Sequence, residues 1–254
     1  MMPSPVLWYP DPGDPVPPGA GIHIWRVRLD RPSGEVERLR AFLAEEERLR
    51  AERFHFPEHR RHFIVARGVL RVLLGRYLRQ PPGQIRFAYN RYGKPFPDPD
   101  DGFRFNLSHS GGMALYAFAR RGEIGIDMEW MGRGVGEMEQ IAERFFAPRE
   151  ARTLLGLPAP ERKAGFFRCW TRKEAYVKAR GRGLSIPLDR FEVALAPEEE
   201  PRLLVNHDDP GDADRWSMHS FVPEKDYIAA LVVEGADHGI TYYDFVPEKP
   251  PVSR

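Results

Sequence analysis

The sequence has 254 residues, of which 42% are hydrophobic, enough to bury the core of one large domain or two small ones. Its 38 basic and 37 acidic residues nearly balance, so no overall field favours nucleic acid or a membrane surface as a partner. The single cysteine, Cys169, cannot form an internal disulfide, and no apolar run or N-terminal pattern indicates a membrane span or a signal peptide. We therefore expect a cytoplasmic protein.

The first half of the chain alternates strand and helix patterns. Residues 1–20 are rich in proline and predict an irregular leader. Apolar residues then recur at strand or helix spacing in six or more segments. The spacing predicts strands at 21–29, 85–89, 103–107, 113–118 and 123–130, and helices at 35–53 and from Pro57 to Pro81.

The second half repeats this alternation. The pattern predicts helices at 137–145, 148–155 and 162–180, and strands at 190–195, 202–205, 216–222 and 227–233. Residues 247–254 are predicted to be a loose tail. The fold class is therefore α+β, with two similar subdomains in one chain, at 21–122 and 123–246.

Three carboxylates and a lysine suggest a metal site. Asp127 and Glu129 are two residues apart in a predicted strand, so both project from one face of the sheet. Trp170, Glu174 and Lys178 are four apart in a predicted helix and lie along one stripe. Carboxylates combined with substrate phosphate are the usual ligands of Mg²⁺. The alternative for the strand pair alone is a solvated face, but its neighbours are apolar.

The segment 104–112 combines a strand with a polar, glycine-containing turn. Glycines let a ligand approach the backbone, and the side chains of Ser108 and His109 can bond to phosphate oxygens. A nucleophilic serine is a rival interpretation, although no G-x-S-x-G elbow surrounds Ser108. A plain structural turn remains a third interpretation. The turn at 90–95 is ordinary by itself, and its interest is that it precedes this segment.

Arginines and histidines are frequent between Arg48 and Arg71. Most of them are expected to form a solvated helix face paired with the interspersed glutamates, and one or two could bind a phosphate. Those glutamates argue against nucleic-acid binding. Cys169 is expected to be packed rather than catalytic.

Taken in order, these segments resemble the 4′-phosphopantetheinyl transferases of the large, surfactin-synthetase-activating type. The resemblance spans roughly residues 40–195. It is carried by Tyr92-Gly93-Lys94-Pro95, by residues 105–110, by residues 125–129, by Arg144-Phe145-Phe146, and by residues 170–185. It implies transfer of the phosphopantetheine arm of coenzyme A to a serine of an apo acyl, polyketide or peptidyl carrier protein, by a monomer that releases 3′,5′-ADP.

The resemblance also implies an active site in the cleft between the two α+β subdomains, where coenzyme A binds, and it implies roles for individual residues. Asp127, Glu129 and Glu174 would hold Mg²⁺, and Lys178 would contact a phosphate. The coenzyme A site would be lined by Asn106, Ser108 and His109, by Tyr89, Tyr92, Gly93, Lys94 and Pro95 beside the adenine, and by Arg50 and Arg48 at the 3′-phosphate. A serine hydroxyl is a weak nucleophile and needs a base, for which we favour Glu174, with Asp127 and Lys178 as the other catalytic residues.

Two other functions fit the same residues. A Mg²⁺-dependent nucleotide or pyrophosphate hydrolase would use the same carboxylates, but it would consume coenzyme A without a carrier protein. A non-catalytic coenzyme A or carrier-binding module would not need three carboxylates and Lys178 in this arrangement.

Overall fold

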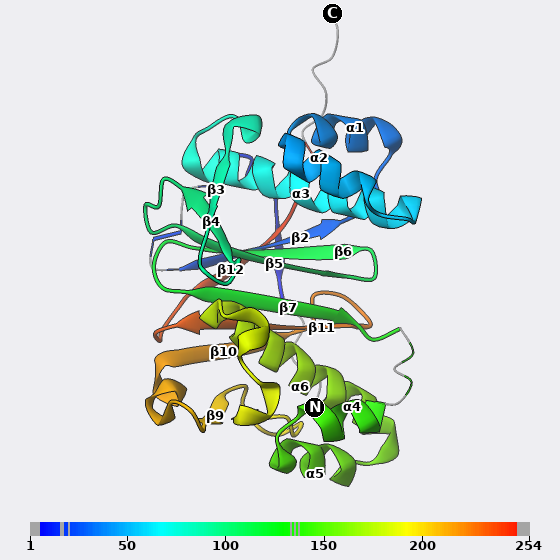
Figure 1. Cartoon of the computed structure of the whole chain (residues 1–254), viewed down its shortest axis with the longest axis vertical. Helices are drawn as coiled ribbons and strands as arrows, with labels where there is room; N and C mark the ends of the chain where they lie inside the picture. Colours follow the sequence, from blue (N-terminus) through cyan, green and yellow to red (C-terminus); the bar gives the residue numbers. More distant parts are fainter. Residues whose placement is uncertain are drawn as a thin grey trace, which may run out of the picture.

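The computed structural model describes residues 6–15, 18–19, 21–132, 134, 136 and 138–247. Two sheets are stacked in the middle of the molecule, and helices cover the outer face of each (Figure 1). The first half contributes β1 (Trp8–Pro10), β2 (Ile22–Arg28), α1 (Ser33–Ala41), α2 (Glu45–Glu52), α3 (Pro57–Leu78), β3 (Arg86–Tyr89), β4 (Pro95–Asp98), β5 (Arg104–Ser110) and β6 (Met113–Ala119). The second half contributes β7 (Ile124–Trp130), α4 (Met138–Phe145), α5 (Pro148–Gly156), α6 (Ala159–Arg180), β8 (Phe191–Val193), β9 (Leu203–Asn206), β10 (Trp216–Phe221), β11 (Tyr227–Glu234) and β12 (Ile240–Asp244).

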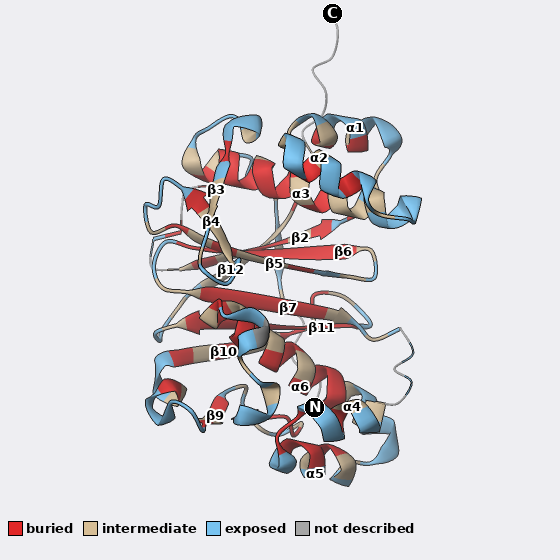
Figure 2. Cartoon of the chain, in the orientation of Figure 1, coloured by how far each residue is buried: buried red, intermediate tan, exposed pale blue. Residues whose placement is uncertain are grey.

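The layers are held by three apolar cores. The five-stranded sheet has the order β1-β12-β2-β6-β5, and its outer face packs on α3 through residues such as Leu70 and Phe118. The three-stranded sheet has the order β10-β11-β7 and packs on α6 through residues such as Phe167 and Ile228. Between the sheets, Ile24, Ile126 and their neighbours form the third core. Buried strands therefore occupy the centre of the molecule, between half-exposed helices (Figure 2). Among the described helices, none is both long and apolar enough to cross a bilayer.

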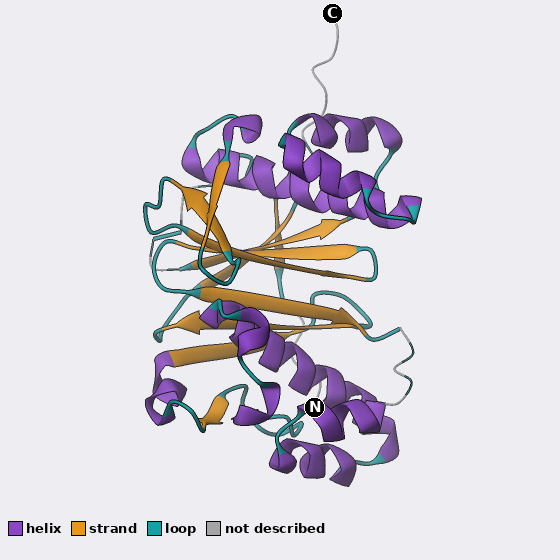
Figure 3. Ribbon diagram, viewed as in Figure 1, coloured by secondary structure: helices purple, strands orange, loops and turns teal. Residues whose placement is uncertain are grey.

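Most predicted elements are present, and the two-subdomain α+β class is confirmed (Figure 3). The predicted helix 35–53 is wrong, because it is divided into α1 and α2. Leu43 turns into the core, and the carboxylate of Glu47 then accepts the backbone N–H of Ala44 at 2.9 Å. This bond satisfies a free donor at the start of α2, so a new helix begins there.

The irregular leader is also wrong in part, since Trp8–Pro10 forms β1. This strand pairs in parallel with β12, which in turn pairs in parallel with β2. Strand β12 thus completes the sheet of the first half, although its residues fall within the predicted second subdomain. Neither strand is visible as a long alternating pattern, because each is short and gains its order from a distant partner. Of the predicted tail, only residue 247 lies within the described residues.

Helix α6 lies directly against β7, and Gly125 makes this possible. A Cβ atom at that position would clash with the backbone of Ala175 and Ala179. The helix ends at Gly181, which adopts a left-handed conformation with φ of 62° and donates its N–H to the Val177 carbonyl at 3.0 Å. As a result, the last two turns of α6 are held beside the face of β7 that carries Asp127 and Glu129.

We predict that Gly125→Ala destabilises the fold by about 1–3 kcal/mol or more, because the added methyl group must push α6 away from β7. Urea unfolding followed by circular dichroism would measure the loss. Gly156→Ala is a matched control, since nothing lies within 4 Å of a Cβ atom there. An equal loss in both variants would contradict the close-approach explanation.

Candidate active site

The candidate site lies where the two halves meet, along β5 and β7. These strands belong to different sheets, and polar side chains of β5 take the place of a backbone partner for β7. The N–H groups of Ile126, Met128 and Trp130 are donated to Asn106 Oδ1 at 2.9 Å, Ser108 Oγ at 3.2 Å and Ser110 Oγ at 3.1 Å. We call these three side chains and the N–H groups that they accept the seam.

Two of the seam side chains also hold carboxylates. Ser108 Oγ donates to Asp127 Oδ1 at 2.9 Å, and Ser110 Oγ donates to Glu129 Oε2 at 2.8 Å. Asp127 is only 5% exposed. Its second oxygen, Oδ2, is buried and has no hydrogen-bond partner among the described residues. A buried carboxylate oxygen without a donor is costly, so it is suited to a ligand from outside the chain.

Helix α6 brings the third carboxylate and the lysine to the same place. Lys178 Nζ donates to Asp127 Oδ1 at 2.7 Å and to the Ile126 carbonyl at 3.1 Å. Burial raises the pKa of Glu174, and the negative charges of Asp127 and Glu129 raise it further, against the opposing effect of Lys178. The predicted trio thus forms one electrostatic cluster, as the helix and strand spacing indicated.

The cluster has the chemistry of a Mg²⁺ site in which the protein supplies part of the coordination. All three carboxylates offer hard oxygen ligands, and Asp127 Oδ2 accepts no hydrogen bond from the described residues. Among the described residues, the group whose possible metal-ligand atoms all lie within 4.8 Å of one another is Asp30, Glu58 and His62, in which both acids are exposed. The three predicted carboxylates are not as close together as this. The predicted trio is therefore not a closed cage, which suits an ion that also takes phosphate and water ligands.

Two cavities meet beside this cluster. One, of about 440 Å³, is lined by residues of α2, α3, β3 and β5, including Arg50, Tyr89 and His109. The other, of about 600 Å³, is lined by Glu174, Lys178, Asn106 and an apolar wall. Gly93 and Pro95, in and after the turn between β3 and β4, line both. The two cavities are therefore neighbours that share this part of their walls.

The two predicted arginines separate. Arg50 lines the first cavity, where its guanidinium lies 5.4 Å from the ring centre of Phe63. Arg48 lines neither cavity, and its guanidinium donates to the Ala41 carbonyl at 3.3 Å. Two residues that are two apart on a helix point in nearly opposite directions, so α2 can present only one of them to the site. The two cavities thus support Arg50, and the role of Arg48 stays a prediction.

Lys94 lines the second cavity, but its ammonium group is already bonded to other parts of the protein. Its ammonium group donates to Glu123 at 2.7 Å and to the carbonyls of Ile124 and Ala179, both at 3.0 Å. Burial lowers the pKa of Lys94, against the raising effect of Glu123. The side chain therefore fastens the turn to the start of β7 and the end of α6. Tyr92 lines the second cavity at the same turn.

The predicted polar turn at Ser108 and His109 is wrong in one respect, because both residues lie within β5. Neighbouring side chains of a strand point to opposite faces, so Ser108 enters the seam and His109 enters the first cavity. Loss of surrounding water and the nearby charge of Lys178 lower the pKa of His109. The imidazole of His109 is therefore harder to protonate than that of a free histidine.

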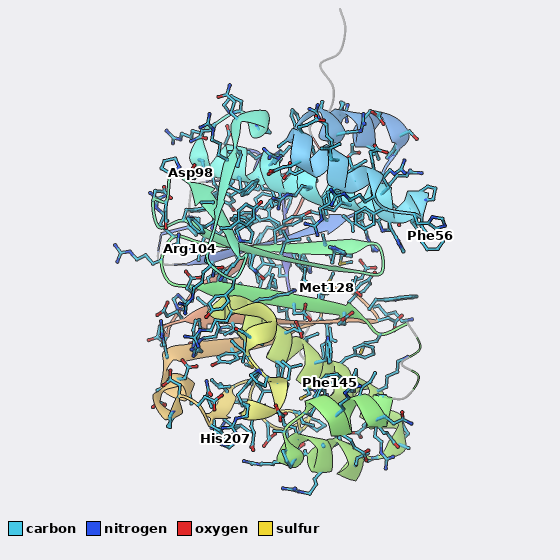
Figure 4. All side chains as sticks on the ribbon, in the orientation of Figure 1. Phe56, Asp98, Arg104, Met128, Phe145 and His207 are labelled. Atoms are coloured by element: carbon cyan, nitrogen blue, oxygen red, sulfur yellow. The ribbon has the colours of Figure 1, made fainter. Side chains whose placement is uncertain are left out.

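Some residues that line the site were not among the predicted site residues. The apolar wall of the second cavity includes Phe145, Trp170 and Ile186. Phe145, labelled in Figure 4, is 40% exposed at the end of α4, whereas Phe146 is 2% exposed and packs in the core. Ser110 lies within the motif 105–110 but was not predicted to be a site residue. The alternation of small polar residues at 106, 108 and 110 was the signal that could have revealed the seam.

Comparison with known proteins gives consistent matches over the chain. The family model described as the 4′-phosphopantetheinyl transferase superfamily matches residues 123–232, and that of the 4′-phosphopantetheinyl transferase N-terminal region matches residues 31–120. The 4′-phosphopantetheinyl transferase HetI of Nostoc sp. is 42% identical over 90% of this chain and 94% of its own length. The enzyme Sfp of Bacillus subtilis is 35% identical over 68% of this chain and 77% of its own length.

Solved structures are more distant. A holo-(acyl-carrier-protein) synthase from Bacillus anthracis, in complex with CoA (3′,5′-ADP), is 26% identical with a TM-score of 0.33. It matches 44% of this chain and 94% of its own chain.

We predict that Glu174→Gln stabilises the metal-free protein at pH 7. The raised pKa of Glu174 means that the ionised carboxylate costs stability as the pH rises above its ordinary value of 4.5, and the full cost applies above the raised value. The advantage of the variant should vanish when the pH falls below 4.5. Urea unfolding in EDTA at several pH values would measure it. Glu143→Gln, at an exposed position of α4, should show no such dependence, and a matching gain there would contradict the interpretation.

Proposed function

The chain belongs to the 4′-phosphopantetheinyl transferase superfamily, and we propose that it transfers the 4′-phosphopantetheine arm of coenzyme A to a serine hydroxyl of an apo carrier protein. The observation that carries the proposal is the cluster of Asp127, Glu129 and Glu174 with Lys178, beside a cavity that both halves line. Phosphoryl transfer requires charge neutralisation and positioning above all, and this arrangement offers both.

The transfer would proceed by one displacement at phosphorus. The serine oxygen of the carrier forms a bond to the phosphorus that carries pantetheine, and the bond from that phosphorus to the bridging oxygen breaks. The bridging oxygen keeps the electron pair and leaves as part of 3′,5′-ADP. The hydroxyl proton passes to Glu174, directly or through a water molecule. Glu174 lines the cavity beside Lys178, so its carboxylate is placed where the reaction would occur.

The charged side chains of the cluster have separate duties. Asp127, Glu129 and Glu174 would hold Mg²⁺, which when bound acts as a Lewis acid on the pyrophosphate. Lys178 already lies 2.7 Å from Asp127 and would share its charge with a phosphate oxygen. His109, whose pKa is lowered in the free protein, would be favoured in its protonated form when a phosphate approaches. Arg50 would meet the 3′-phosphate in the first cavity.

We also propose that the protein works as a cytoplasmic monomer on acyl, polyketide or peptidyl carriers. Both walls of the site come from one chain, so a second copy is not needed to complete it. Cys169, the only cysteine, is buried, and burial raises the pKa of its thiol well above the ordinary value.

Glu174→Gln should lower the transfer rate at saturating Mg²⁺ by about 100-fold or more, because the amide cannot accept the proton and is a poorer metal ligand. The assay incubates the protein with coenzyme A, Mg²⁺ and an apo carrier, and follows the mass gained by the carrier. Wild-type turnover of the variant would contradict the assignment. Consumption of coenzyme A by the wild type without a carrier would instead indicate a hydrolase.

Arg50→Ala should raise the KM for coenzyme A by about 10-fold, as expected for a lost charged hydrogen bond, and leave kcat nearly unchanged. With dephospho-coenzyme A, which lacks the 3′-phosphate, the variant and the wild type should behave alike. Arg48→Ala is the matched control, since this arginine lies outside both cavities. If the Arg50 variant still prefers coenzyme A to the dephospho form as strongly as the wild type does, Arg50 does not bind the 3′-phosphate.

A further inference from the structure

The hydroxyl groups of Ser108 and Ser110 each make two bonds of opposite direction. Each accepts an N–H group from β7, at Met128 and Trp130, and each donates its own proton to a carboxylate, at Asp127 and Glu129. A hydroxyl has one proton and can rotate about its C–O bond. Here the N–H group from β7 occupies the acceptor side, so the proton is directed at the carboxylate.

Asn106 shows what the seam needs for structure alone. It accepts the N–H of Ile126 at 2.9 Å, as the serines accept theirs. The residue on β7 that would correspond to Asp127 or Glu129 at this level is Gly125, which has no side chain to hold. An amide therefore suffices where only a backbone group is bound. Serine is found at both levels where a carboxylate must be held as well.

The bond from Ser108 also decides which oxygen of Asp127 remains available. Ser108 and Lys178 both donate to Oδ1, at 2.9 and 2.7 Å. Oδ2 is left buried without a partner among the described residues. Two donors on one oxygen fix the rotation of the carboxylate, so the other oxygen points in a defined direction.

We propose that Ser108 and Ser110 are positioning residues of the metal site, each orienting one carboxylate, rather than contacts to coenzyme A. This inference rests on the proposed function, because it assumes that Asp127 and Glu129 hold a divalent cation. It replaces the contact to coenzyme A that the family resemblance implies for Ser108. Residues that orient metal ligands typically change metal affinity by about 10–100-fold when they are removed.

The test measures binding of Mn²⁺ to the protein alone, by electron paramagnetic resonance of the free ion, and then the KM for coenzyme A. Ser110→Ala and Ser108→Ala should each weaken Mn²⁺ binding by about 10-fold or more, and leave the KM for coenzyme A within about twofold when Mn²⁺ is saturating. Ser110→Thr keeps the hydroxyl and should retain wild-type affinity for Mn²⁺. Asn106→Ala removes a seam contact of the same kind and should lower the melting temperature without weakening Mn²⁺ binding.

Three outcomes would overturn the inference: wild-type Mn²⁺ affinity in folded Ser110→Ala, a loss in Asn106→Ala as large as in the serine variants, or a rise in the KM for coenzyme A alone. Ser110 is half-buried and tests the inference by itself if the buried Ser108→Ala variant fails to fold. Failure of the proposed function is separate. It would be seen as wild-type protein that binds Mn²⁺ but does not modify a carrier.

Discussion

The seam between β5 and β7 is the constraint on which the rest of the molecule depends. Two sheets with apolar inner faces could slide over each other, because dispersion contacts have little direction. Hydrogen bonds from three consecutive inward N–H groups of β7 to Asn106, Ser108 and Ser110 allow one register only. The carboxylates alternate with those N–H groups along the same strand. The same hydrogen bonds therefore align the two halves and position the acidic cluster.

A second constraint acts from the other side of β7. Helix α6 can deliver Glu174 and Lys178 only because Gly125 leaves room for its backbone. Deeper in the same helix, Lys173 forms a fully buried ion pair with Glu150 at 2.7 Å. Neighbouring residues of the motif thus have opposite duties, since Lys173 fixes the helix to α5 while Glu174 faces the cavity. Such buried pairs are costly to break, so they resist rotation of the helix about its axis.

The sequence was informative wherever a period of 2 or 3.6 residues decided the outcome. Asp127 and Glu129 share a strand face, and Glu174 and Lys178 share a helix stripe, so their meeting could be predicted. The hydrogen-bond partners that occupy a side chain could not be predicted, because these partners are distant in sequence. Lysine and serine both suit phosphate binding. In this structure, however, Lys94 donates to the carbonyls of Ile124 and Ala179, and Ser108 accepts the N–H of Met128 in β7. The different directions of Arg48 and Arg50 could have been predicted, since residues two apart on a helix point to nearly opposite sides.

The position of β12 has a consequence for how the protein is made. This strand lies between β1 and β2, so the sheet of the first half stays incomplete until β12 has been synthesised. An emerging first half would expose the edge of β2, and unpaired edges invite association with other chains. Pairing β2 with β12 closes a loop of most of the chain length, a slow class of contact. The first half can thus form its full sheet only after the second half has been made, when β12 pairs with β2.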